Sequence, residues 1–250
     1  MTFSLAGVLA GSLAMGTAGI LRGFTGFGTA LAGVPLLSLV FAPRLAVPTI
    51  MALQIATGLQ NLHADGRHVE WRTLLRLLPG AVVGIVPGLW LLLWLSADAA
   101  RLAIGLIVVL TSLLLQRGWR LERLPGTGGL LALGVLSGVL NGLAAIAGPP
   151  VIALFFALRR SPEVTRASLA AFFLCNGVLG LSLALGKGLI APGELWLAAL
   201  LCPAMILGTT LGGRLFTGDL KRHYRLVGLV ALLAVGLAAA ARGAIGLWLG

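Results

Sequence analysis

The sequence predicts an all-α integral membrane protein built from two inverted repeats, and three observations support this fold class. Hydrophobic residues make up 59% of the 250 residues and charged residues only 10%, with a mean hydropathy of +1.06. A water-soluble domain of this size cannot bury so much apolar surface. The apolar runs are continuous rather than alternating, which excludes a β-barrel. Glycine- and proline-rich patterns of the first half also recur in the second half.

The repeat is clearest at two interrupted apolar segments. Residues 26–35 (GFGTALAGVP) correspond to residues 141–150 (NGLAAIAGPP) at an offset of 115 residues. At an offset of 124 residues, a second set recurs as Pro79/Pro203, Gly84/Gly208, Gly88/Gly212 and Arg101/Arg225. Duplicated apolar segments interrupted by glycine or proline are typical of the binding sites of secondary transporters. We predict a first transmembrane repeat at 1–117, a cytoplasmic linker at 118–126 and a second, inverted repeat at 127–250.

Apolar runs between charged residues predict five helical segments in each half. The expected segments are 3–21, 29–42, 45–62, 73–95 and 99–116, then 127–140, 149–158, 165–186, 192–213 and 224–241. The run 149–158 has only ten residues, whereas crossing a bilayer takes roughly 20. We therefore favour a broken, re-entrant hairpin from the first two segments of each half, followed by three full spans. Five full spans per repeat would fit the charges equally well.

The lysine and arginine residues orient the chain. When alternate loops are assigned to one side, that side receives 14 of the 18 basic residues, which marks it as cytoplasmic. Both termini then lie on the opposite, non-cytoplasmic side of the membrane. An odd number of segments per half turns the second repeat upside down. The formal charge of +11 is therefore a topology signal, and no basic run is interleaved with aromatic residues as a nucleic-acid surface requires.

The first interruption supplies the first set of candidate site residues. The helix that begins near Thr29 would direct its free N–H groups and the positive end of its dipole towards this gap, which suits an anion. We expect the substrate to contact Arg22, Thr25, Gly26, Gly28 and Thr29. Arg22 lies near the membrane midplane if the hairpin forms, where a cation is costly and usually functional. If the segment spans the membrane instead, Arg22 is a topology charge. The alternative for the glycines is that they only allow helices to pack tightly.

The second interruption would form a matching anion cradle. Its candidate residues are Asn141, Gly142, Gly148 and Pro149, with proline tolerated in the first turn of the helix that it begins. We expect the two interruptions to meet near the middle of the membrane.

Polar side chains inside the apolar segments complete the predicted site, in which Gln54 and Asn176 would donate hydrogen bonds to the anion. Gln54 and Thr57 lie three residues apart and share one helix face. Asn176 corresponds to Thr57 at an offset of 119 residues, so both would face the pseudo-two-fold axis. The alternative is that these groups only form hydrogen bonds between helices.

Other chemistry is not indicated. The three histidines fall in polar loops, the two cysteines lie in apolar segments, and no catalytic set of side chains lies at membrane depth. We therefore expect no enzyme activity, no metal and no cofactor. No buried acid identifies a proton carrier, so a coupling proton or ion stays unassigned, as does the oligomeric state.

These motifs resemble the sulfite exporter TauE/SafE family of membrane permeases. The matching features are the run Gly23–Gly28 (GFTGFG) followed by residues 34–37 (VPLL), residues 148–150 (GPP) before an apolar run, and the paired Pro/Gly spacings given above. The resemblance covers essentially the whole chain and implies export or uptake of small sulfur-containing anions such as sulfite or organosulfonates. The second half has LAAIA at 143–147 where the resemblance leads us to expect more glycine. Alternatives are a permease for another small solute, or a non-transporting membrane subunit or assembly factor.

Overall fold

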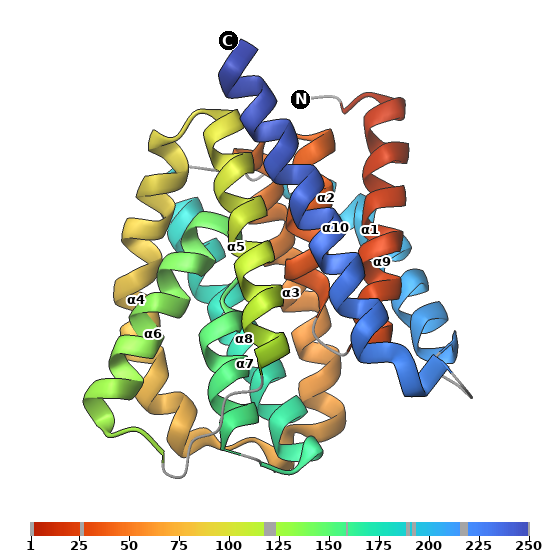
Figure 1. The fold of residues 1–250 in the computed structure, drawn as a ribbon. Coiled ribbons are helices and arrows are strands. Elements are labelled where there is room, and N and C mark those ends of the chain that lie inside the picture. The colour runs from red at the N-terminus through yellow and green to blue at the C-terminus, as the bar shows by residue number, and fades with distance from the viewer. Residues whose placement is uncertain are drawn as a thin grey trace. The chain divides into compact units, whose positions relative to one another are not determined.

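The described part of the chain is helical (Figure 1). The computed structural model describes residues 3–25, 28–117, 124–158, 160–188, 191, 194–215 and 220–249. The helices are α1 (Leu5–Thr25), α2 (Gly28–Val40), α3 (Pro43–Asp65), η1 (Gly66–His68), α4 (Trp71–Trp94), α5 (Ala97–Arg117), α6 (Thr127–Ala144), α7 (Gly148–Ala157), α8 (Pro162–Gly186), α9 (Leu195–Leu215) and α10 (Leu220–Leu249). Each predicted apolar segment corresponds to one α-helix, which confirms the all-α prediction.

Seven of the described helices are long and apolar enough to cross a membrane: α1, α4, α5, α6, α8, α9 and α10. The chain is therefore a multi-pass membrane protein. The short apolar helices are α2 and α7, which directly follow the two predicted interruptions. However, α1 and α6, which we expected to be the first arms of the hairpins, reach spanning length. The re-entrant hairpins and the inverted orientation of the second repeat stay predictions.

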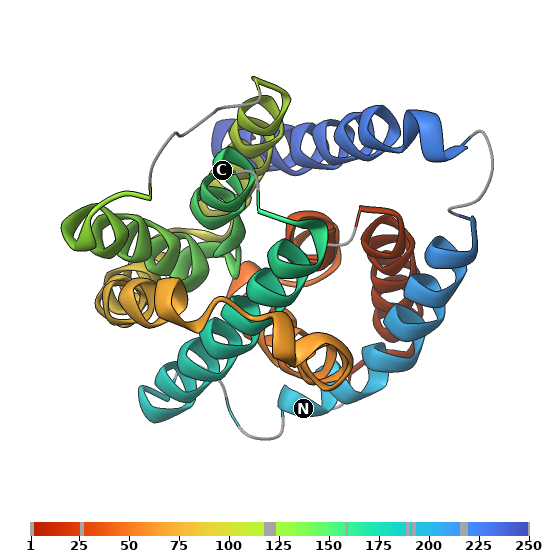
Figure 2. The same ribbon diagram turned by 90° about the horizontal axis from the view of Figure 1, so that it is seen from below.

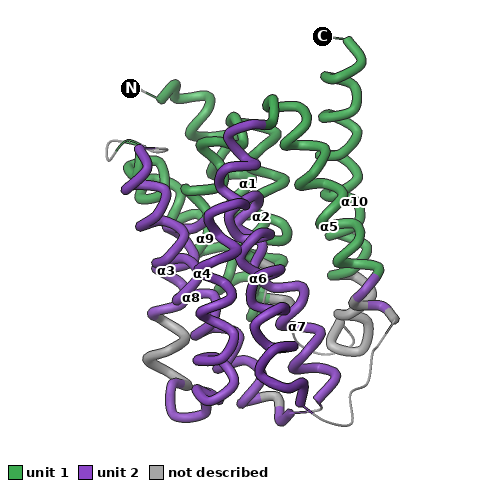
Figure 3. The backbone as a smooth tube through the Cα atoms, turned by 90° about the vertical axis from the view of Figure 1, so that its left-hand side faces the viewer, with its two compact units in different colours: residues 1–50, 95–113, 189–250 green, residues 51–94, 114–188 purple. Residues whose placement is uncertain are grey.

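The helices gather into two compact units, coloured separately in Figure 3. Unit 1 comprises residues 1–50, 95–113 and 189–250, and unit 2 comprises residues 51–94 and 114–188. Each unit therefore contains segments from both halves of the sequence. The division into repeats at 1–117 and 127–250 remains a prediction. Residues 118–123, which form most of the predicted linker, lie outside the described residues.

Unit 2 is built around the packing of α4 against α6, visible in Figure 2. Glycines line both sides of this contact: Gly80, Gly84 and Gly88 on α4, and Gly134, Gly138 and Gly142 on α6. A Cβ atom on Gly84 would overlap the carbonyl oxygen of Val135. Such close backbone approach through small residues is how helices pack strongly within a membrane.

Unit 1 repeats this arrangement with different helices, because α1 packs against α9 (Figure 2). Gly19 and Gly23 of α1 face Gly208 and Gly212 of α9. A Cβ atom on Gly208 would overlap the carbonyl oxygen of Gly16. In addition, α2 packs against α1 and α10, which holds the short helix within unit 1.

Candidate functional site

The first break lies between α1 and α2 in unit 1. α1 ends at Thr25 and α2 begins at Gly28, which confirms the predicted interruption, while Gly26 lies outside the described residues. The first N–H groups of a helix have no acceptor within their own helix. The first proline of α2 is Pro35, so every residue of its first turn keeps its N–H group. The start of α2 therefore offers several main-chain donors and the positive end of a helix dipole.

Arg22 lies in the last turn of α1, beside the first break, and is only 8% exposed. Thr29, in the first turn of α2, is also buried. The two ion pairs within the described residues join Arg101 to Asp98 and Arg160 to Glu70, and neither includes Arg22. A buried guanidinium group is costly unless a negative charge balances it. The first break thus combines a buried cation with main-chain donors.

The second break is residues 145–147, between α6 and α7 in unit 2, and is buried throughout. Ala145 turns the chain with a φ of 51°, the one positive φ of a non-glycine residue in the described chain. Its N–H group donates to the Asn141 carbonyl at 2.6 Å, and that of Ile146 donates to the Leu140 carbonyl at 3.2 Å. These bonds close the end of α6 in the left-handed manner usually reserved for glycine.

Fewer main-chain donors are available at the start of α7 than at the start of α2. Pro149 and Pro150 occupy the first turn of α7 directly after Gly148, and proline has no N–H group. The predicted anion cradle at Gly148 and Pro149 is therefore poorer in donors than its counterpart in unit 1. A Cβ atom on Gly148 would lie 2.9 Å from Ile152 Cδ1 and 3.3 Å from Phe173 Cζ.

The amides of Gln54, Asn141 and Asn176 bond to main-chain carbonyl oxygens in unit 2. Gln54 Nε2 donates to the Ala145 carbonyl at 2.7 Å, which ties α3 to the second break. Asn141 Nδ2 donates to the Asn176 carbonyl at 3.0 Å, and Asn176 Nδ2 donates to the Phe172 carbonyl at 3.0 Å. A carbonyl can only accept, so these partners determine which end of each amide faces them.

The oxygen ends of the same amides have no hydrogen-bond partner within the described residues. They are Gln54 Oε1, Asn141 Oδ1 and Asn176 Oδ1, and the hydroxyl of Ser137 shares this property. The four residues are between 0 and 5% exposed. Sequence reasoning missed Ser137, although it lies one helical turn before Asn141 and so shares a face of α6 with it.

Two other predicted site residues of unit 2 have structural partners. The Thr57 hydroxyl lies 3.1 Å from the Leu53 carbonyl and 3.2 Å from the Gln54 carbonyl, so it can donate within its own helix. Gly142 lies inside α6, where a Cβ atom would overlap the carbonyl oxygen of Ile85 on α4. These positions fit helix packing, the alternative that the sequence left open.

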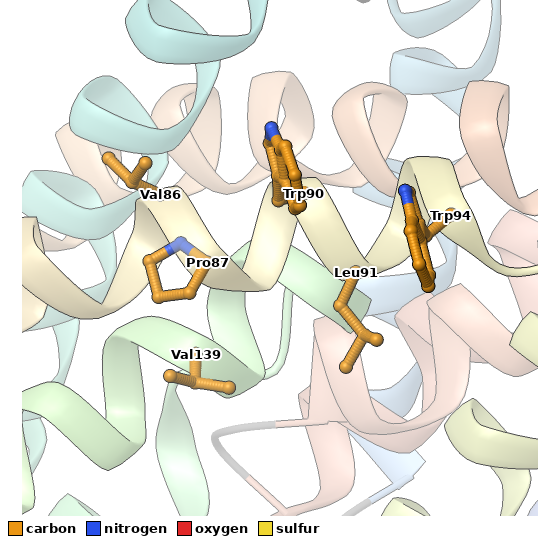
Figure 4. Close-up of a pocket in the computed structure, with 6 residues that line it drawn as sticks. All are labelled: Val86, Pro87, Trp90, Leu91, Trp94 and Val139. Atoms are coloured by element: carbon orange, nitrogen blue, oxygen red, sulfur yellow. The ribbon is translucent and has the colours of Figure 1, made fainter.

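An open pocket of about 550 Å³ also lies on unit 2 (Figure 4). Val86, Pro87, Trp90, Leu91, Trp94 and Val139 line it. Trp90 and Trp94 stack with ring centroids 6.3 Å apart. Its apolar lining does not suit a small anion. Within the described residues, no group of three or more His, Cys, Asp or Glu side chains could hold a metal ion.

Comparison with known proteins identifies the family. The sequence profile of the family described as "Sulfite exporter TauE/SafE" matches residues 4–239. The "Probable sulfite/organosulfonate exporter TauE" of Cupriavidus necator is 27% identical over 199 residues, covering 76% of this chain and 77% of its own. The "Probable inner membrane transporter protein TsaS" of Comamonas testosteroni is 30% identical over 199 residues, covering 75% of this chain and 80% of its own. No solved structure matches the chain significantly. The chain belongs to the sulfite exporter TauE/SafE family.

Proposed function

We propose that the protein exports small sulfur-containing anions, such as sulfite or organosulfonates, across the bacterial inner membrane by alternating access. Family membership and the names of both relatives support this function. In this proposal the cytoplasmic side is the arginine-rich side, and both termini are periplasmic. A gradient-driven transporter of this kind needs a site reached from each side in turn, and duplicated broken helices supply one.

The observation that supports an anionic substrate most directly is the first break. Arg22 is buried in the last turn of α1, just before the break, and α2 begins just after it with first-turn N–H groups that have no helical acceptor. A guanidinium group and a helix N-terminus both favour an oxyanion, the first by charge-assisted hydrogen bonds and the second by its dipole. Sulfite and sulfonates present such oxygens. Thr29 adds a hydroxyl group that can donate to the same ligand.

Reconstitution tests the proposal. The purified protein is placed in liposomes loaded with sulfite, sulfoacetate, taurine or sulfate, and efflux is followed with and without a proton gradient. We expect sulfite or one organosulfonate to leave at least tenfold faster than sulfate, and faster than from protein-free liposomes. Flux of uncharged solutes without anion flux would indicate a different permease. Absence of flux for every solute would indicate a non-transporting subunit.

A further inference from the structure

We propose that unit 2 contains a binding site for a small monovalent cation, for which Na⁺ is the probe, formed by side-chain oxygens of Gln54, Ser137, Asn141 and Asn176. Each of these buried oxygens has no partner within the described residues. A buried polar group without a hydrogen bond is costly, so native proteins rarely keep several of them together without a ligand.

Hydrogen bonds connect Gln54, Asn141 and Asn176, and Ser137 lies one helical turn before Asn141 on the same face of α6. Ala145 links Gln54 and Asn141, because its carbonyl accepts from Gln54 Nε2 and its N–H donates to the Asn141 carbonyl. Asn141 in turn bonds to the carbonyl of Asn176. The next residue, Gly177, lies against Gln54, since a Cβ atom there would be 3.5 Å from Gln54 Cβ. Helices α3, α6 and α8 therefore meet at the second break.

The chemistry of the group favours a cation over an anion. Each amide nitrogen already donates to a carbonyl oxygen, whereas each amide oxygen has no partner within the described residues, and these free acceptors repel an oxyanion. The C-terminal end of α6 adds the negative end of a helix dipole. Oxygens are the ligands that hard cations prefer, but Ca²⁺ and Mg²⁺ usually require carboxylates, and these four side chains include none. A monovalent ion fits this neutral set.

This site would give the transporter a coupling ion, a role that rests on the proposed anion export. In secondary transporters, carbonyl oxygens at unwound helix ends bind coupling cations, while helix N-termini face anionic substrates. Binding of the cation can be measured without transport, so the two proposals fail separately. Sulfite efflux without any cation binding would leave the proposed function intact and remove this site.

The test is thermal unfolding of the purified full-length protein at pH 8 in NaCl, KCl or choline chloride at equal chloride concentration. Because a ligand that binds only the folded state raises its stability, we expect 100 mM NaCl to raise Tm by about 5 °C over choline chloride. Binding of ²²Na⁺ to the same sample provides a direct second readout. Equal Tm values in all three salts, or no saturable ²²Na⁺ binding, would overturn the proposal.

Two substitutions at Gln54 separate ligand binding from structural support. Gln54→Met and Gln54→Glu both remove the amide that bonds to Ala145, but only Glu retains side-chain oxygens and adds negative charge. We expect Gln54→Met to raise the Na⁺ concentration for half-maximal binding at least tenfold, and Gln54→Glu to keep it or lower it. Equal weakening by both variants, or wild-type binding by Gln54→Met, would contradict the site.

Substitutions at two buried serines provide a second test of the site if the Gln54 variants do not fold. Ser137 and Ser112 are both fully buried in apolar helices, but the Ser112 hydroxyl already donates to the Val108 carbonyl at 2.8 Å. We expect Ser137→Ala to weaken ²²Na⁺ binding about tenfold and Ser112→Ala to leave it unchanged. If both variants bind Na⁺ as the wild type does, Ser137 and the proposed cluster are not the site.

Discussion

The two breaks occupy corresponding places in the sequence but present opposite chemistry. In unit 1, the first break is bordered by the buried Arg22 and by a helix start with all its N–H groups. In unit 2, the second break is bordered by amide oxygens without a partner in the described part of the chain, and by a helix start with two prolines. The 115-residue offset that aligns the breaks also places Ser137 opposite Arg22. The two positions aligned by this offset thus hold a cation in one unit and a neutral acceptor in the other.

The helix pairs that support the breaks are, in contrast, alike. α1 corresponds to α6 at the 115-residue offset, and α4 corresponds to α9 at the 124-residue offset. The contact of α1 with α9 in unit 1 is therefore the counterpart of the contact of α4 with α6 in unit 2. The comparison teaches that the chain keeps the packing of its halves while the chemistry of their breaks diverges. This shared packing supports the predicted repeat.

The largest expected effect tests whether the pair α1 and α9 packs in the same way as the pair α4 and α6. Gly84 and Gly208 correspond at the 124-residue offset, and a Cβ atom on either would overlap a carbonyl oxygen of the facing helix. Gly84→Leu and Gly208→Leu should each destabilise the fold by about 3 kcal/mol or more, because backbone cannot move aside as a side chain can. The measurement is the yield of monodisperse protein and its Tm.

Gly213→Leu is the matched control for these variants. Gly213 lies in α9 next to Gly212, but a Cβ atom there would have no atom of the described residues within 4 Å. We expect this control to purify as the wild type does. If Gly84→Leu were tolerated while Gly208→Leu was not, the two helix pairs would not be equivalent.

The next largest effect tests the cationic character of the first break. Arg22→Gln removes the charge but keeps a polar side chain, and should raise the sulfite concentration for half-maximal efflux about 100-fold, since hydrogen bonds between charged groups contribute roughly 1.5–3 kcal/mol. Arg22→Lys keeps the charge but not the planar donor geometry, and should raise the same sulfite concentration about tenfold. Efflux rates in liposomes check both values.

An opposite result would support the other interpretation of Arg22, as a topology charge. In that case Arg22→Gln would transport sulfite normally once inserted, and would change only the fraction of protein inserted in the correct orientation. Accessibility of the termini to protease in spheroplasts measures that fraction and keeps the two interpretations apart.

Bulky residues at the breaks should have a smaller effect and lower the rate of efflux at least tenfold. Gly28→Leu and Gly148→Leu place a side chain where each broken helix begins again. At Gly148 the nearest atoms are the ends of the Ile152 and Phe173 side chains, which can shift, so folding should survive. Efflux and membrane insertion are measured together. Gly186→Leu is the control, because Gly186 lies at the end of α8 and a Cβ atom there would have no atom of the described residues within 4 Å. Unchanged efflux in the Gly148 variant would exclude that position from the transport path.

The sequence was sufficient to predict the helices and the position of both breaks. Charged residues bound most of the apolar runs, and the glycines and prolines at 26–35 and 141–150 flank the two interruptions of the helices. It could not predict how helices from the two halves gather into units, because that depends on contacts between residues distant in sequence. The glycine spacing in α1, α4, α6 and α9 indicated close packing without identifying the partners.

The direction of the buried amides also could not be predicted. Glutamine and asparagine each have a donor and an acceptor, and the sequence does not show which end meets a main-chain carbonyl. We expected Gln54 and Asn176 to donate to an anion, but their described N–H partners are the carbonyls of Ala145 and Phe172. The spacing of Ser137 from Asn141 was too weak a signal by itself, because a lone serine in an apolar helix is also typical of packing.

The smallest effect concerns the backbone of the second break, where alanine adopts a conformation that favours glycine. A non-glycine residue in the left-handed region costs roughly 1–2 kcal/mol, and glycine loses about 0.4–1 kcal/mol more conformational entropy on folding. Ala145→Gly should therefore stabilise the protein by about 0.5–1 kcal/mol, seen as a higher Tm. Ala147 lies in the same break with a φ of −70°, so Ala147→Gly gains no relief and should lower Tm. Lower Tm for both variants would mean that Ala145 is not strained, and that its turn is held by the Asn141 and Leu140 carbonyls at no conformational cost.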